Sequence, residues 1–206
     1  MPGSGPLRRS CVVQRRQEGT GMADDARALS DGDQYGLDLG VEVERTAWGE
    51  WVDPARRLAA ARRFMRLAEI EDLPESPWAP DSSEARRLNP IVEQLFPDLE
   101  TAMGPENAEM TDAFICFVGE CFIAYAGGQW IDYEWPGREC SFYDAINPAL
   151  RLDTEDEDEL TAWFVMESMI GYHREEHEGM FSEFAAALGE YAADHEQAER
   201  DESRTG

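Results

Sequence analysis

The most hydrophobic stretch of the chain lies between residues 113 and 126. If it is helical, apolar side chains occupy nearly every angle around it, and Glu120 is its only charged residue. A helix that is hydrophobic on all sides is normally buried at the centre of its domain. The pattern therefore predicts a central core helix over residues 107–126, which ends at Gly127 and Gly128.

Helix start signals predict amphipathic helices before this core helix. Asp53-Pro54 is typical of an N-cap followed by a first helical position, and it predicts an Ala- and Arg-rich helix that runs to about Ile70. Asp81 with Glu84 resembles a capping box. We therefore expect a shorter helical path from there to Met103, restarted or kinked at its prolines.

A second capping box predicts a helix after the core segment. Thr154 and Glu157 have the required spacing, and the acidic run 155–159 would complement the dipole of the first helical turns. The hydrophobic pattern continues this helix through Met169, and the polar composition ends it near Asp194.

Strand signals are fewer and shorter. Residues 37–43 alternate apolar and polar side chains, which indicates a half-buried strand. Two further strands are predicted at residues 129–135 and 139–143, on either side of Pro136-Gly137. This dipeptide favours a type II turn, so we expect a longer or bulged hairpin loop.

These elements predict one α+β, mostly α domain over residues 22–195, with a central apolar helix packed by amphipathic helices and a small antiparallel sheet. A chain of 206 residues can bury one sizeable core. Residues 1–21 lack the apolar segment of a secretory signal, and we expect a disordered tail or an over-extended start there. Residues 196–206 are polar and charged, which predicts a disordered acidic tail.

The charge of the chain restricts its partners. Its formal net charge is −26, and all 18 of its basic Lys and Arg positions are Arg. Such a chain repels nucleic-acid phosphates and anionic membranes and attracts a basic protein. An acidic, Lys-free surface also suits a high-salt cytoplasm, and GC-rich codon usage is another explanation for the missing Lys. The four cysteines show no C-x-x-C spacing, which favours a reducing cytoplasm.

Two charged features inside the helices need partners. The predicted helix that follows Pro54 has five arginines, and we expect it to dock on acidic helices of the same chain or of a homodimer rather than on nucleic acid. Glu120 in the core helix is costly unless it is paired. We expect an ion pair with an arginine such as Arg86, Arg87 or Arg138, and a proton-handling catalytic role is the alternative.

The run His173-Arg-Glu-Glu-His177 resembles the H-x-x-E-H zinc signature of inverzincin metallopeptidases. The resemblance implies that His173 and His177 bind zinc, that Glu176 polarises a water, and that a Glu well downstream completes the site. Only 29 residues follow His177, and they predict a helix continuation and a tail instead. The alternative is semi-buried packing, because both histidines share one apolar helical stripe with His195.

The segment from Trp130 to Trp135 interleaves aromatic and acidic residues. Strand alternation places Ile131, Tyr133 and Trp135 on one face. We expect the other face to present Trp130 as an anchor beside carboxylates, as protein interfaces often do. The predicted partner-binding residues are Trp130, Asp132 and Glu134 of that face, together with Trp135 at the end of the segment. The alternative is a plain hairpin that covers the core.

No G-x-S-x-G, P-loop, Rossmann glycine set or supported Cys–His pair occurs in the sequence. We therefore expect a non-enzymatic, acidic cytoplasmic interaction protein without a cofactor, which inhibits or regulates a basic partner. An immunity- or antitoxin-like inhibitor is one form of this function, by analogy of size and charge alone. The alternative is a small zinc-binding protein or metal-dependent hydrolase built on His173, Glu176 and His177. In a third interpretation the charge reflects only the intracellular salt.

Overall fold

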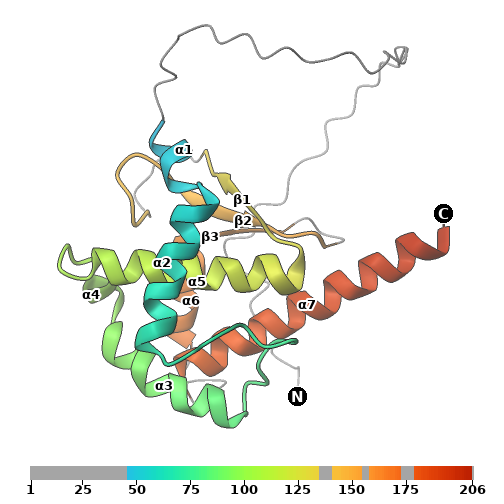
Figure 1. The fold of residues 1–206 in the computed structure, drawn as a ribbon, viewed down its shortest axis with the longest axis horizontal. Helices are drawn as coiled ribbons and strands as arrows, with labels where there is room; N and C mark the ends of the chain where they lie inside the picture. Colours follow the sequence, from blue (N-terminus) through green and yellow to red (C-terminus); the bar gives the residue numbers. More distant parts are fainter. Residues whose placement is uncertain (1–45, 135–140, 155–157, 173–178, 206) are drawn as a thin grey trace, which may run out of the picture.

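The computed structural model describes residues 46–134, 141–154, 158–172 and 179–205. The strand predicted at residues 37–43 lies outside this part of the chain, as do Trp135 and the H-x-x-E-H run at 173–177. The described residues form, in chain order, α1 (Ala47–Trp51), α2 (Pro54–Leu67), α3 (Ser83–Leu95), α4 (Leu99–Met103), α5 (Ala108–Ala126), β1 (Gln129–Asp132), β2 (Pro148–Arg151), β3 (Glu159–Thr161), α6 (Ala162–Tyr172) and α7 (Met180–Thr205) (Figure 1). The predicted α+β, mostly helical fold is confirmed.

Helix α5 is the centre of the core, as its all-round hydrophobic pattern predicts. Both α2 and α7 pack against it. The ring of Phe117 on α5 lies 4.8 Å from that of Phe64 on α2 and 6.5 Å from that of Phe181 on α7, measured between centroids. The helix ends at Gly127, which adopts a left-handed φ of 60°. Because L-residues other than glycine rarely adopt this conformation, the glycine stops the helix as predicted.

The sheet is antiparallel with the strand order β1-β2-β3. The prediction that residues 139–143 form the second strand is wrong for the described residues 141–143, and β2 pairs with β1 instead. Ala149 and Leu150 of β2 are fully buried. Burial of these side chains outweighs the local turn signal, and Pro148 stands at the first residue of a strand, where a missing N–H is tolerated.

The helix predicted from Thr154 and Glu157 does not extend over the described residues 158–161. Glu159–Thr161 forms β3, whose Leu160 is buried, and α6 begins only at Ala162. The backbone N–H of Phe164 donates to the hydroxyl of Thr161, which takes the capping role instead. An apolar residue that the sheet can bury therefore overrides a capping signal in an acidic run.

The other helix boundaries follow the predicted signals with two corrections. Asp53 caps α2 by accepting from the backbone of Arg56, as predicted, whereas Ser82 rather than Asp81 caps α3. Helix α7 continues to Thr205, so its predicted end near Asp194 is wrong, whereas the disordered acidic tail predicted at 196–206 stays a prediction. No helix among the described residues is long and apolar enough to cross a lipid bilayer.

Candidate functional site

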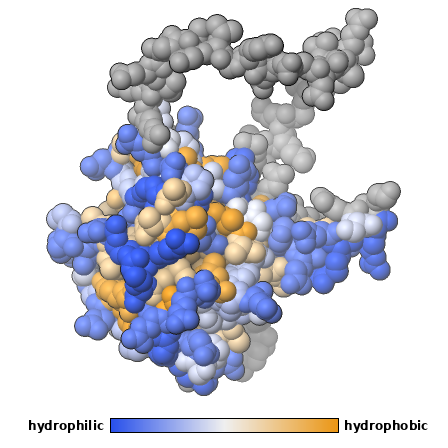
Figure 2. All heavy atoms as spheres, in the orientation of Figure 1, coloured by the Kyte–Doolittle hydropathy of each residue, from blue (hydrophilic) through white to orange (hydrophobic). Residues whose placement is uncertain are grey.

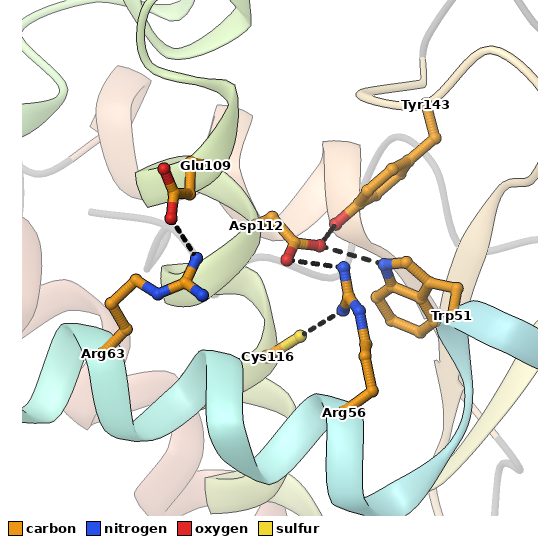
Figure 3. A network of polar contacts seen from close by, with 7 residues as sticks. All are labelled: Trp51, Arg56, Arg63, Glu109, Asp112, Cys116 and Tyr143. Carbon is orange, nitrogen blue, oxygen red and sulfur yellow. Dashed lines mark hydrogen bonds and ion pairs between the residues drawn. The ribbon is translucent and has the colours of Figure 1, made fainter.

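Asp112 on α5 is the centre of a polar network that joins four segments (Figure 3). Its Oδ1 accepts from Trp51 Nε1 at 3.0 Å and from the Tyr143 hydroxyl at 2.8 Å. Its Oδ2 accepts from Arg56 Nη2 at 2.6 Å. Three donors satisfy a carboxylate well, so the Asp112 side chain ties α1, α2 and the loop before β2 to the core helix.

The other groups of this network are kept in their protonated forms. Burial, with Asp112 nearby, raises the pKa of Tyr143 well above its usual value. Burial also raises the pKa of Cys116 to about 12, even though Arg56 Nη1 lies 3.2 Å from its sulfur. Because the thiolate is the reactive form of cysteine, a neutral buried thiol is a poor nucleophile. The chemistry of the network therefore fits a rigid structural joint.

Two further ion pairs connect α2 to α5. Arg57 pairs with Glu120, and Arg63 Nη1 lies 2.5 Å from Glu109 Oε1. Burial raises the pKa of Glu120, and the charge of Arg57 opposes that effect. The Arg-rich helix thus docks within the same chain, as expected, but it docks on three acids of the apolar core helix and not on an acidic helix.

The predicted ion pair of Glu120 is confirmed, but its partner is Arg57 and not one of the three arginines expected. A helical spacing of 100° per residue places Glu109, Asp112, Cys116 and Glu120 on one face of α5. The sequence therefore contained a signal for all three ion pairs with α2, namely a polar stripe on an otherwise apolar helix. The sequence analysis considered Glu120 alone and did not use the stripe.

Trp130 faces the core, which corrects its predicted role as an exposed anchor. Its side chain is 7% exposed, and its ring meets that of Trp51 edge-on at 4.9 Å. A Cβ on Gly119 would lie 2.0 Å from Trp130 Cζ2, so only glycine leaves room for the indole there. Alternation correctly separates two faces of β1, but both faces carry a large apolar side chain, and the pattern does not say which one is buried.

The acids of the same segment have different surroundings. Asp132 is half-buried and accepts from the backbone N–H of Asn147 at 2.8 Å, which fixes the chain before β2. Glu134 is exposed. Trp135 lies outside the described residues, so a partner-binding role of this segment stays a prediction.

A segment with four exposed acids follows α2. We call residues 69–75 the acidic loop, and its exposed acids are Glu69, Glu71, Asp72 and Glu75. None of these four forms an ion pair with another described residue. The loop borders an open hollow of about 370 Å³, to which Arg62, Met65, Arg66 and Ile70 also contribute.

The acidic loop is held firmly at both ends. The Tyr125 hydroxyl donates to the Pro74 carbonyl at 2.6 Å, and Arg87 Nη1 donates to the Ala68 carbonyl at 2.7 Å. Trp78 follows the loop, half-buried, with its ring 5.4 Å from that of Phe181. These contacts fix the backbone that carries the exposed carboxylates.

The third histidine of the predicted stripe has a structural contact. His195 Nδ1 lies 2.9 Å from the Asp153 carbonyl oxygen, and a Cβ on Gly127 would lie 2.7 Å from His195 Cε1. Within the described part of the chain, no group of three or more His, Cys, Asp or Glu residues is arranged to hold a metal ion. The zinc site predicted from His173, Glu176 and His177 falls outside that part and stays untested.

Comparisons with models of protein families, with curated proteins and with solved structures found no match to this chain.

Proposed function

We propose that this protein is a non-enzymatic, cytoplasmic binding protein that inhibits or regulates a basic partner protein, and that the acidic loop is its main recognition surface. The main support for the proposal is the difference between charged residues that form ion pairs within the protein and those that do not. Three of the five arginines of α2 pair with acids of α5, whereas the acids of the acidic loop lack such partners among the described residues. Uncompensated carboxylates on a chain of charge −26 attract cationic surfaces and repel nucleic acids.

The backbone of Glu69 supports a role for its carboxylate. Its φ is 52°, in the left-handed region. The Ile70 N–H donates to the Met65 carbonyl at 2.8 Å, which is the helix-ending arrangement that favours glycine at this position. A side chain there costs roughly 1 kcal/mol relative to a relaxed backbone. Glutamate therefore stands where glycine suits the fold better, as expected if the carboxylate serves binding.

The surroundings of the loop also suit an interface. Ile70, Leu73 and Trp78 are half-buried and lie among the exposed acids along the chain. Interfaces often combine aromatic and aliphatic anchors with complementary charge. The contacts of Pro74 and Ala68 hold the loop in place before binding, which lowers the entropy lost when a partner docks.

A cytoplasmic location is part of this proposal. Cys116 and Cys121 are free thiols in the core. Free buried cysteines are compatible with a reducing compartment, where disulfides are rare.

The test is a pull-down with the purified full chain from its native lysate, followed by affinity measurement with the purified captured protein. We expect a basic partner that is recovered at low salt and lost at high salt. The triple variant Glu71→Gln/Asp72→Asn/Glu75→Gln should bind it at least about tenfold more weakly.

The matched control is Glu100→Gln/Glu106→Gln/Glu190→Gln. It makes the same change in net charge at exposed acids outside the acidic loop. Equal weakening by both triple variants would show that only net charge matters, and recovery of no basic partner would overturn the proposal.

The H-x-x-E-H spacing supports a second candidate, a small zinc-binding protein or metal-dependent hydrolase. Elemental analysis of the purified chain and of His173→Ala/His177→Ala tests it. Stoichiometric zinc in the wild type that disappears in the double variant would favour this candidate over a purely acidic binding protein.

A further inference from the structure

One face of α2 points away from α5 and is both basic and apolar. We call Ala55, Leu58, Ala59, Arg62 and Arg66 the basic stripe. All five side chains are exposed, with Leu58 at 41%. At 100° per residue they fall within a sector of about 100° on the helix. In Figure 2, strongly hydrophilic side chains lie beside a hydrophobic patch in the region of α2.

The two arginines of the basic stripe take no part in the ion pairs that join α2 to α5. Arg56, Arg57 and Arg63 on the same helix all pair with α5. Neither Arg62 nor Arg66 forms an ion pair with any other described residue. An unpaired cationic face is unusual on a chain of charge −26, and it complements an acidic helix.

The distal end of α7 is an acidic helix without a surface to pack on. We call residues 196–205 the distal segment. No described side chain beyond Ala192 is buried, and His195 contacts the Asp153 carbonyl just before the distal segment. Figure 1 shows the helix running on past the rest of the molecule, and Figure 2 shows hydrophilic side chains there. A polar helix of this length is marginal on its own in water, which favours a partner surface for it.

We propose that two copies of the protein associate by docking the distal segment of each on the basic stripe of the other. The distal segment spans about 15 Å and α2 about 21 Å, so one fits along the other. Ala55 and Ala59 leave room for a second helix to approach closely, and Leu58 supplies an apolar contact. Both contacts form at once in a two-fold dimer, because each copy carries one stripe and one distal segment. Arg62 and Arg66 border the same open hollow as Glu69 and Glu71 of the acidic loop, so the dimer is tested with that loop left unchanged.

Overall repulsion between two acidic copies does not prevent this contact. At physiological ionic strength charges are screened over about 8 Å, so the adjacent groups determine the electrostatic energy. Glu196 and Glu199 on the distal segment are exposed in a single copy, where Glu196 lies 3.7 Å from Arg200 and Glu199 lies 3.7 Å from His195. Contact with Arg62 and Arg66 of a second copy would place opposite charges side by side.

The experiment is sedimentation velocity of the full chain over a wide concentration range at physiological salt, with two charge-reversal variants. Arg62→Glu/Arg66→Glu makes both helices acidic, and Glu196→Arg/Glu199→Arg makes both basic. We expect a concentration-dependent dimer for the wild type and at least an about tenfold weaker dimer for each variant alone. An equimolar mixture of the two variants should dimerise like the wild type, since both contacts in the mixed dimer are again complementary.

The single variant Arg62→Glu is measured as well, and Arg86→Glu on α3 is its matched control. Both arginines are exposed, and both changes alter the net charge equally. The control should dimerise like the wild type. The proposal is overturned if the wild type stays monomeric or if each variant alone dimerises like the wild type. It is also overturned if the mixture fails to associate while both variants keep the circular dichroism of the wild type.

Discussion

The two sides of α2 carry the same residue type in different surroundings. Arg57 is 11% exposed and pairs with Glu120 of the core helix, whereas Arg62 is exposed and pairs with no described residue. A charge that is removed from water needs its partner, and breaking such a pair destabilises the fold. A solvated charge contributes little to folding and is available for association. The same helix thus provides an internal joint on one side and a free surface on the other.

The largest effect expected on the internal side comes from Asp112→Ala. It leaves Trp51 Nε1, the Tyr143 hydroxyl and Arg56 Nη2 without their common acceptor. We expect a loss of about 3 kcal/mol in the free energy of unfolding, measured by urea denaturation. The control Glu109→Ala removes the 77% exposed partner of Arg63 and should change it by less than about 0.5 kcal/mol. Similar losses in both variants would contradict the distinction between a buried joint and a surface pair.

The direct comparison of the two sides is Arg57→Ala against Arg62→Ala. Arg57 also donates from Nε to the Val52 carbonyl at 3.0 Å, so its loss leaves two acceptors without a donor. We expect Arg57→Ala to lower the free energy of unfolding by about 2 kcal/mol and Arg62→Ala to change it by less than about 0.5 kcal/mol. Denaturant unfolding at low protein concentration measures both without a contribution from self-association. Equal effects would show that both arginines play the same part.

The pH dependence of stability tests the surroundings of Glu120. Burial raises its pKa in the folded state above the usual 4.5, so the folded state binds this proton more tightly than the unfolded state. Its contribution to stability is therefore full below pH 4.5 and falls as pH rises through the folded pKa. Glu120→Gln removes this titration, and the wild type should lose stability relative to the variant across that window. If the free energies of unfolding of the wild type and the variant change in parallel with pH, the raised pKa of Glu120 is contradicted.

The smallest effect concerns the end of α2, where Glu69 has a left-handed backbone. Glu69→Gly relieves that conformation but gives the unfolded chain more freedom, so we expect a gain of about 0.5 kcal/mol in the free energy of unfolding. Thermal denaturation measures it, with Glu71→Gly as a control that should be neutral or destabilising. If Glu69→Gly destabilises the protein, the carboxylate has a structural role instead.

Local signals predicted the elements that depend on local chemistry. The apolar residues of α5 occupy every side of the helix, so its burial followed from the sequence, and Asp53 capped α2 because a cap requires only neighbouring backbone. The candidate site was predicted in part. An ion pair for Glu120 followed from the energy of burying a charge, but Arg57 is 63 positions away, and only the packing of α2 on α5 brings the two together.

The mistaken elements were those in which a local signal competed with burial. Leu160 lies just after an acidic run that is typical of a helix start, yet it is 3% exposed in β3. Trp130 lies on the strand face that seemed free for a partner, yet Gly119 leaves a space that its indole fills. In both cases the free energy of burying a large apolar side chain exceeds the local preference.

The amino-acid sequence by itself determined the acidic surface, the central helix and the need to pair a charge inside it, because these depend on composition and on short-range periodicity. The tertiary structure decided which side of α2 is internal and which is free. That choice depends on how two helices far apart in sequence cross, and it separates the arginines that hold the fold from those that pair with no other described residue.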